Sequence, residues 1–315
     1  MINATETTLA IREVTMSNTT ETATVLVIGA TGQTGRLIVQ ELERDPGATQ
    51  VRISSRRKDQ VEQLRTEGRD AVYLDLDDPL TFPAALEGVD RLYLLTGYTV
   101  AMLVQSKTIV DAAKKAGVQH IVHQGVFSDW DTTDPHFAWH EMIERYIEAS
   151  GIAWTHLHPN IFMEAMIGTF SIRNDIFPWY MGEPRVGWVA LKDLATVAAT
   201  VLREGSQRHG GQNYWLSVES LNATEVASIL SDVLDRQIRH ELKQPSDLLK
   251  DFQESSVRAE PLYAASAVEW AEQVSDGRMA SIGIIRDDVM RVTGKKSIRF
   301  RDWAVENRDQ LLKIG

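Results

Sequence analysis

Three glycines near the start of the chain have the spacing of a phosphate-binding turn. Gly29, Gly32 and Gly35 follow a β-forming run, 24–28, and precede a pattern that predicts an amphipathic helix from about residue 36. Glycine allows unusual dihedral angles, close approach of a diphosphate and tight packing of the helix on the strand. The helix N-terminus would add free N–H groups and a partial positive charge. This context predicts dinucleotide binding, and the alternative is a tight turn without a ligand.

The exit of the second predicted strand, 50–54, indicates which dinucleotide is bound. An NAD site places a carboxylate there for the 2′-hydroxyl of the adenosine ribose, whereas an NADP site places cations for a 2′-phosphate. Here the strand runs into Ser55, Arg56, Arg57 and Lys58, with no carboxylate. Arg56 can bind phosphate oxygens through two N–H groups, with Arg57 or Lys58 in support and Ser55 as a donor. We therefore expect NADP(H), and the alternative is a solvated basic loop.

Further contacts with the dinucleotide are expected where the next two strands end. Asp75 and Leu76 close the third predicted strand, where the adenine edge would lie. Thr96 and Gly97 close the fourth, along the path from the diphosphate to the nicotinamide. The cofactor contacts expected from these patterns are Gly29, Thr31, Gly32, Gln33, Thr34, Gly35, Ser55, Arg56, Arg57, Asp75, Leu76, Thr96 and Gly97.

Two side chains are candidate proton donors for the chemistry of such a dinucleotide. His140 lies beside an apolar stripe on a predicted helix, 135–149, and the usual histidine pKa of about 6.5 suits an acid at neutral pH. Tyr98 follows the fourth strand. The alternatives are a surface histidine without a role and an aromatic ring that covers the diphosphate. Hydride transfer mainly needs a nicotinamide held against an acceptor carbon, so few other catalytic groups are required.

The histidines also raise the question of a metal site. Six of the eight lie between residues 120 and 158. His136 and His140 are four residues apart on one predicted helix, and His156 and His158 share a strand face, a spacing that zinc or iron could use. No carboxylate sits in a matching helical motif, and the two pairs come from separate elements. We therefore expect no metal.

The elements that must position these residues alternate between strand and helix in the first half of the chain. Strand-like runs cover 24–28, 50–54, 71–76, 91–96, 120–126 and 154–158, and helical patterns cover 36–44, 58–67, 80–87, 100–116 and 135–149. Gly117 suits the end of one helix, and Asp134-Pro135 suits the start of another. This alternation predicts an α/β fold with a doubly wound parallel sheet of the Rossmann type, which binds ligands beyond the carboxyl ends of its strands.

The pattern loosens from about residue 162 and predicts a smaller α/β substrate lobe. Strands are expected near 213–217 and 237–243, with one helix from about Leu191 and another opened by the capping-box pattern Asn222–Glu225. Some of these segments are expected to return to the main sheet.

Three regions are therefore expected along the chain. The first is a polar, disordered tail at 1–22, with Met16 as an alternative start. A nucleotide-binding Rossmann domain follows at 23–161. A C-terminal substrate lobe occupies 162–315 and is partly interleaved with the Rossmann sheet.

Composition limits the classes of protein to which the chain can belong. It has 315 residues, of which 43% are hydrophobic, a net charge of −11 and a pI near 5.3. This acidity argues against duplex nucleic acid or an anionic membrane as the main partner, and no apolar run approaches the ~18 residues of a spanning helix. The absence of cysteine excludes thiol nucleophiles and thiolate metal sites and suits the cytoplasm. We expect a cytoplasmic protein whose partner is a small molecule.

Several segments resemble the NmrA-like group of atypical short-chain dehydrogenase/reductases. They are the glycine turn with its basic second-strand exit, the segments 292–295 and 300–303, and above all the segment 150–164. The resemblance extends from roughly residue 24 to the end. It implies an NADP(H)-binding fold, monomeric or a homodimer, with a C-terminal substrate lobe. It also implies that Asn160 and Phe162 lie by the nicotinamide and that Phe127 and Ser128 lie at the mouth of the cleft.

The chain departs from this group where a proton donor is usually found. It has no Tyr-x-x-x-Lys pattern. Trp139 stands where the reductase branch often has a lysine, and Gln124-Gly125 stands where a serine often holds a substrate oxygen. His158-Pro159 replaces a common Arg-Pro. The residues that usually supply or assist the proton in this group are therefore replaced in this chain.

Two functions are compatible with these patterns. The first is an NADPH-dependent reductase of a hydrophobic, aromatic or conjugated molecule such as a quinone, an enone or a dye. The second is a non-catalytic NADP(H) sensor that reports redox state to a protein partner. Trp139 favours the sensor, whereas an aromatic pocket and the lack of a nucleic-acid-binding segment favour the enzyme. The substrate contacts expected for the enzyme are Phe127, Ser128, Trp139, Met163, Glu164 and Met166.

Overall fold

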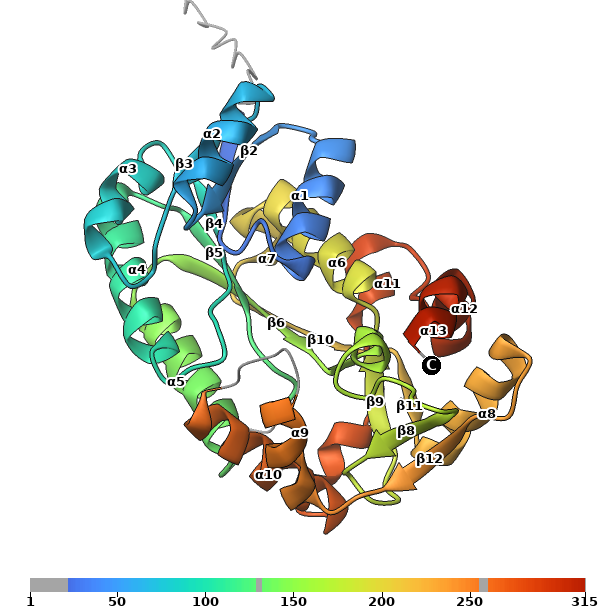
Figure 1. Cartoon of the computed structure of the whole chain (residues 1–315). Helices are drawn as coiled ribbons and strands as arrows, with labels where there is room; N and C mark the ends of the chain where they lie inside the picture. Colours follow the sequence, from blue (N-terminus) through green and yellow to red (C-terminus); the bar gives the residue numbers. More distant parts are fainter. Residues whose placement is uncertain (1–21, 129–131, 255–259, 315) are drawn as a thin grey trace, which may run out of the picture.

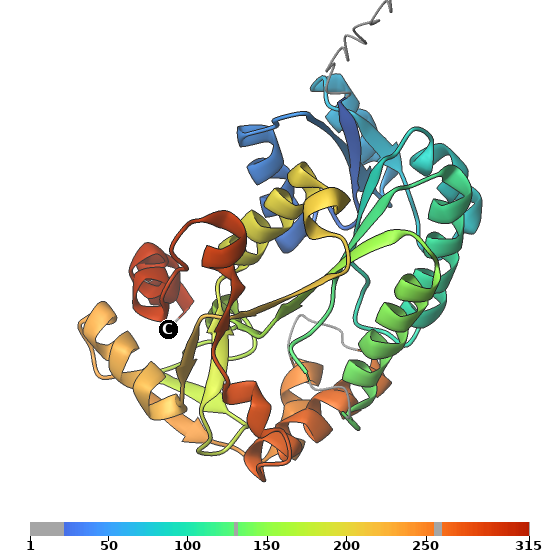
Figure 2. The ribbon, with the colours of Figure 1, turned by 180° about the vertical axis from the view of Figure 1, so that it is seen from behind.

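The computed structural model describes residues 22–128, 132–254 and 260–314 (Figure 1). The expected tail at 1–22 lies outside the described residues apart from Thr22. The described residues form a large sheet with helices on both faces, and a group of shorter strands and helices lies beyond one end of it (Figures 1 and 2).

The large sheet has eight strands in the order β13-β10-β6-β5-β4-β1-β2-β3. Neighbouring strands are parallel, except that β13 runs antiparallel to β10. The strands are β1 (Ala23–Val27), β2 (Thr49–Ser55), β3 (Ala71–Tyr73), β4 (Arg91–Leu94), β5 (His120–Gln124), β6 (Ala153–Pro159), β10 (Gln212–Ser217) and β13 (Arg286–Asp287). The predicted doubly wound parallel sheet is confirmed.

Alternating side chains of the first strand enter two separate cores, one on each face of the sheet. Val25 and Val27 belong to the core beneath α1, α2 and α6, whereas Leu26 and Ile28 belong to the core beneath α3, α4 and α5. Both faces are therefore covered, as a parallel sheet requires. The covering helices are α1 (Gln33–Arg44), α2 (Lys58–Thr66), α3 (Phe82–Leu86), α4 (Met102–Ala116), α5 (Pro135–Ala149) and α6 (Leu191–Glu204).

Residues after 161 build the shorter elements and also extend the large sheet. A three-stranded sheet joins β11 (Glu219–Leu221), β9 (Val186–Val189) and β7 (Ile161–Phe162), and a two-stranded sheet joins β12 (Arg239–Leu242) and β8 (Ile176–Trp179). From the same part of the chain, β10 and β13 return to the edge of the large sheet. The other helices are α7 (Ser206–His209), α8 (Ala223–Leu234), α9 (Leu248–Glu254), α10 (Pro261–Ser275), α11 (Asp288–Thr293), α12 (Phe300–Glu306) and α13 (Arg308–Ile314), with 3₁₀ turns η1 (Pro79–Thr81), η2 (Met163–Ile167), η3 (Pro245–Asp247) and η4 (Ala280–Gly283).

Local capping signals in the sequence are confirmed. The carboxylate of Asp134 accepts a hydrogen bond from the main-chain N–H of Phe137 at 2.9 Å, so α5 begins where predicted. Gly117 ends α4 in the left-handed conformation. At the start of α8, Asn222 and Glu225 form a reciprocal capping box with two hydrogen bonds of 3.0 Å.

Three strands end earlier than predicted. β3, β4 and β5 end at Tyr73, Leu94 and Gln124 and not at residues 76, 96 and 126. The reason is the pairing, because the last residues of β2 and β3 that pair are Ser55 and Tyr73, and the chain then turns. The residues beyond these ends lie in loops at the carboxyl edge of the sheet.

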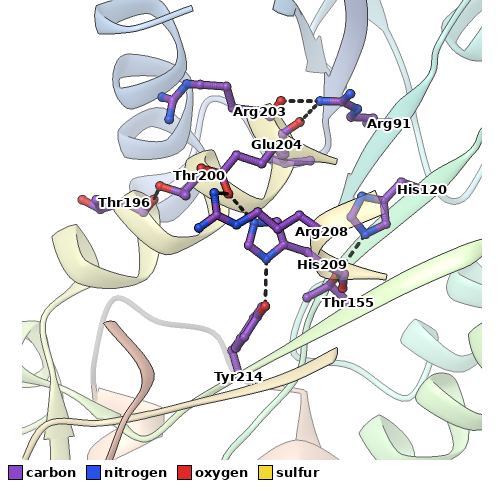
Figure 3. A network of polar contacts seen from close by, with 11 residues as sticks. Arg91, His120, Thr155, Thr196, Thr200, Arg203, Glu204, Arg208, His209 and Tyr214 are labelled. Atoms are coloured by element: carbon purple, nitrogen blue, oxygen red, sulfur yellow. Dashed lines mark hydrogen bonds and ion pairs between the residues drawn. The ribbon is translucent and has the colours of Figure 1, made fainter. Parts of the chain in front are cut away.

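A polar network holds α6 and α7 at the opposite, amino edge of the sheet (Figure 3). The two ring nitrogens of His209 contact the hydroxyl of Tyr214 and a carboxylate oxygen of Glu204, each at 2.7 Å. The hydroxyl of Thr155 donates to the carbonyl of His209 and contacts the ring of His120. Because ligands of this fold bind at the carboxyl edge, we assign this network a structural role.

No helix within the described ranges is long and apolar enough to cross a membrane.

Candidate functional site

The turn between β1 and α1 has a geometry that requires glycine. Gly29 has a φ of +71°, which residues with side chains rarely adopt. A Cβ on Gly35 would lie only 2.2 Å from the carbonyl oxygen of Gly29, so a larger residue would push α1 away from the turn. The main-chain N–H of Gly32 donates to Gly29 at 2.9 Å and closes the turn.

The N-terminus of α1 is open to an anionic ligand. Its N-cap is Gly32, which provides no side-chain cap, and the first turn contains no acidic residue. Thr31 and Gln33 are exposed and Thr34 is half-buried. Free N–H groups at such a terminus bind phosphate through hydrogen bonds and the helix dipole. The turn and the helix start thus form a cradle, residues 29–35, that fits a diphosphate.

The basic segment after β2 contains an arginine whose side chain has no partner among the described residues. Arg57 pairs with Asp59, and Lys58 lies over a tyrosine ring at 5.1 Å from its centre. Ser55 is buried and accepts a hydrogen bond from the main-chain N–H of Arg57. Arg56 is exposed and makes no hydrogen bond or ion pair to any other residue in the described ranges. Arg56 is therefore the cation of this segment that is available to a phosphate.

The residues predicted at the next strand ends lie in two different surroundings. Asp75 is in the loop after β3, where its carboxylate accepts a hydrogen bond from the N–H of Asp77, and Leu76 packs on the core beneath α3. Thr96 and Gly97, after β4, line a cavity at the carboxyl edge of the sheet.

This cavity has a volume of about 250 Å³ and lies beyond the ends of β4, β5 and β6. Leu95 lies between this cavity and the cradle. Its side chain lines the cavity, and its Cδ2 atom is 3.2 Å from the position that a Cβ on Gly29 would occupy. Opposite the sheet, η2, α9 and α10 complete the wall. The large ring side chains on the wall include Tyr98, Phe127, Phe162, Phe252, Tyr263 and Trp270. A planar aromatic molecule fits such a surface.

Several residues singled out in the sequence meet at this cavity. They are Tyr98, Phe127, His140, Asn160 and Phe162. Asn160 also holds the wall together, because its side-chain NH₂ donates to Ser217 and to the carbonyl of Ile282, and its side-chain oxygen accepts the N–H of Ile161. The side-chain amide of Asn160 is thus hydrogen-bonded to other residues of the protein, and we assign Asn160 a positioning role.

Other predicted substrate contacts lie elsewhere, and their assignment needs correction. Met163 and Met166 are fully buried in the core, because η2 turns them away from the cavity. Glu164 accepts hydrogen bonds from the N–H of residue 191 and from the indole of residue 303, each at 3.1 Å. Trp139 packs on the core beneath α3 to α5. Ser128 lines a second, much smaller cavity.

The residues that α9 and α10 contribute were missed in the sequence. Phe252, Tyr263 and Trp270 line the cavity, and the Tyr263 ring packs on Tyr98 with centres 4.9 Å apart. These residues are far along the chain from the strand ends that form the rest of the site. No local sequence pattern therefore connects them with it. The aromatic content of the C-terminal half was the available signal, since such residues can form a pocket as well as a core.

Burial changes the protonation of the polar groups on the wall. It lowers the pKa of His136 to about 4 and the pKa of His140 well below its usual value, so both imidazoles are neutral at pH 7. The expectation of an ordinary pKa for His140 is therefore wrong. Burial raises the pKa of Asp134 to about 6, although its carboxylate accepts a hydrogen bond of 2.7 Å from the hydroxyl of Ser266.

The sequence argument against a metal also needs correction. Glu144 lies four residues after His140 on α5, and the fold brings its carboxylate close to His123, His156 and His158 of the adjoining strands. Burial raises the pKa of Glu144 to about 8. A carboxylate thus accompanies the histidines after all.

Comparison with known proteins agrees with this architecture. Residues 21–276 match the model of the NmrA-like family. A protein named NAD(P)H azoreductase, from Xenophilus azovorans, is 29% identical in an alignment 299 residues long that covers 89% of this chain and 96% of that relative.

Two solved structures illustrate the shared fold. The triphenylmethane reductase of Citrobacter sp., complexed with NADP(H), has a TM-score of 0.75 at 24% identity, covering 90% of this chain and 99% of that one. Nmra, described as a negative transcriptional regulator, has a TM-score of 0.71 at 16% identity, covering 91% and 95%.

Proposed function

Since this chain belongs to the NmrA-like family, we propose that it is an NADPH-dependent oxidoreductase that reduces a hydrophobic, aromatic or conjugated small molecule. The observation that carries the proposal is the ring-lined cavity directly beside the glycine cradle. The relative named NAD(P)H azoreductase and the neighbour named triphenylmethane reductase support a dye-like acceptor. When bound, the reduced nicotinamide supplies the hydride.

The chain's own groups are suited to hold the two ends of this cofactor. Main-chain N–H groups of Thr31, Gln33 and Thr34 would bind the diphosphate at the start of α1, since that of Gly32 closes the turn. Arg56 would bind the 2′-phosphate, because it has no competing partner within the described ranges. Leu95, between the cradle and the cavity, would then direct the nicotinamide end into the cavity.

The cavity wall would orient the acceptor and exclude water. Rings from the sheet side, such as Phe127 and Phe162, face rings from α9 and α10, such as Phe252 and Trp270. A flat conjugated molecule between these two sides would stack against the cofactor site, which brings the reacting carbon into position. Exclusion of water from the cavity strengthens the polar contacts inside it.

Tyr98 and His140 are the residues we propose to hold and protonate the acceptor's polar atom. Both line the cavity. His140 is neutral at pH 7 because burial lowers its pKa. It can therefore relay a proton, but it is not itself a protonated general acid. Tyr98 therefore acts as the donor. His140 would assist it through His136, whose ring centre is 6.2 Å from that of Tyr98 and 4.9 Å from that of His140. Acceptors that form stable anions, such as quinones, need neither.

Turnover with a panel of acceptors tests this function. The panel contains an azo dye, a triphenylmethane dye, a quinone and an enone, and the readout is loss of NADPH absorbance. We expect NADPH to be oxidised with at least one member and NADH to be used less well. Retained NADPH binding without turnover of any member would overturn the catalytic proposal and favour a cofactor-sensing regulator.

A further inference from the structure

A group of buried ionisable side chains lies beneath α5, behind the cavity wall. His123 comes from β5, His156 from β6 and Glu144 from α5, and they are 1%, 0% and 3% exposed. Their nearest donor atoms all lie within 4.8 Å of one another. The Oε1 atom of Glu144 is 3.9 Å from Nδ1 of His123. Three separate elements thus bring two imidazoles and one carboxylate to one point.

These groups lack the hydrogen bonds that burial normally requires. Neither ring nitrogen of His123 and neither ring nitrogen of His156 has a hydrogen-bond partner among the residues that the structure describes. The side chain of Glu144 makes no hydrogen bond to another residue of the described ranges. The nearest other carboxylate oxygen, on Glu148, is 3.7 Å from Nε2 of His156 and beyond hydrogen-bond distance. A buried polar group without a partner is destabilising, so such groups call for a ligand that supplies one.

Other buried histidines of this chain show the contrast. His158 and His209 are 3% and 2% exposed, and both nitrogens of each ring have a partner within 3.0 Å. Three other buried histidines, His120, His136 and His140, each have one ring nitrogen without a partner. Within the described residues, only His123 and His156 have both ring nitrogens buried and without one.

We propose that His123, Glu144 and His156 bind a divalent transition-metal ion of the zinc type. Imidazole nitrogen and carboxylate oxygen are ligands that Zn²⁺ prefers, and two histidines with one carboxylate are a common set. For three donor atoms no more than 4.8 Å apart, a point exists within about 2.8 Å of each, close to the zinc bond length of about 2.1 Å. Side-chain movements of less than about 1 Å would complete the bonds.

A small cavity adjoins the proposed site at Glu144. It has a volume of about 10 Å³ and is lined by Glu144, His158, His140, Glu141 and Ser128, among others. This volume is about that of one water molecule, which could serve as a fourth ligand. Nδ1 of His158 lies 3.6 Å from Oε1 of Glu144 but is engaged with a carbonyl, so His158 would lie next to the ion without binding it.

The ion would fasten α5 to the sheet. Glu144 is the ligand from α5, and the N-terminal half of the same helix places His136 and His140 on the wall of the larger cavity. Binding of the ion would therefore stabilise the fold and the shape of that wall. This inference rests on the cluster alone and does not depend on the proposed reductase function.

Metal content and cobalt spectroscopy test the proposal on tag-free, full-length protein. After chelator treatment and dialysis, we expect one Zn²⁺ per chain on reloading, a visible Co²⁺ absorption band of nitrogen and oxygen ligation, and a higher melting temperature with Zn²⁺. Less than one tenth of an equivalent of Zn²⁺, together with no Co²⁺ band and no change in melting temperature, would overturn it.

Variants identify the ligands. Glu144→Gln keeps the shape of the side chain but removes the charge, and we expect it to weaken Zn²⁺ binding by at least about 100-fold, because even a residue next to a metal ligand contributes 10- to 100-fold. His240→Ala, which changes a half-buried histidine on β12, is the control and should bind Zn²⁺ as the wild type does. Equal affinity in Glu144→Gln and the wild type would contradict the proposed ligand set. If that variant does not fold, the wild-type measurements above still decide the proposal.

Discussion

Replacing Arg56 by alanine should separate the two nicotinamide cofactors. The side chain is exposed and has no partner in the described part of the chain, so its removal costs the free protein little. Contacts with a charged group contribute about 1.5–3 kcal/mol, and solvent exposure of Arg56 favours the lower end. At 1.4 kcal/mol per tenfold, we expect the Kd for NADPH to rise about 10- to 30-fold. The Kd for NADH, which lacks the 2′-phosphate, should change less than about twofold.

Arg57→Ala provides the matched control. Arg57 is adjacent and has the same charge, but it pairs with Asp59 at an exposed position, where such a pair is worth at most about 1 kcal/mol. We expect little change in either affinity for this variant. Isothermal titration calorimetry of both variants with both cofactors measures the four values. An equal loss for NADPH and NADH, or a larger loss in Arg57→Ala, would refute the assignment of the phosphate site.

Four further predictions concern the cradle, the cavity and the fold. Gly35→Ala should weaken binding of both cofactors at least about tenfold, because the new Cβ would lie 2.2 Å from a carbonyl oxygen, and unchanged calorimetry would contradict this. Tyr98→Phe should slow the reduction of an enone about 100-fold and should have little effect on the reduction of a quinone. The control Tyr146→Phe, on the exposed face of α5, should slow neither reaction. Equal rates of enone reduction in the wild type and in Tyr98→Phe would exclude Tyr98 as the donor. Asn222→Ala should lower the free energy of unfolding by about 1 kcal/mol in urea titrations, and no loss would mean that the capping box is not stabilising. The Asp134 carboxyl has a pKa of about 6 in the folded chain and about 3.9 when unfolded, so the free energy of unfolding falls as the pH rises from 4 to 6. Asp134→Asn should reduce this dependence of stability on pH. An unchanged pH dependence would argue against the raised pKa of Asp134.

Local patterns predicted the nucleotide-binding half of the chain well. The glycine turn, the capping of α5 by Asp134 and the parallel strands depend on interactions between residues close in sequence or on a regular alternation. The ends of β3, β4 and β5 were placed two or three residues too far along. Pairing with the neighbouring strand decides where a strand stops, and one sequence read alone does not show that pairing.

The candidate site was predicted only in part, for reasons of long-range packing. Tyr263 and Trp270 reach the cavity from α10, which no local pattern connects to the strand ends. Met163 and Met166 were assigned to the cavity because they are apolar and follow Phe162, but the 3₁₀ turn η2 directs them into the core.

The histidine cluster shows the same limit. Glu144 was overlooked as a partner of His123 and His156 because these residues come together only when α5 packs on the sheet. The spacing within one helix therefore did not reveal that a carboxylate lies beside these histidines.

Transfer of an isotope from the cofactor tests the reductase proposal most directly. NADPH that carries deuterium at C4 of the nicotinamide is incubated with a triphenylmethane dye or an enone, whose reduced carbon retains the label, and the product is analysed by mass spectrometry. Direct hydride transfer within the cavity predicts one deuterium on that carbon, supplied by one of the two C4 positions and not the other. Unlabelled product, or no product from either acceptor, would contradict the account.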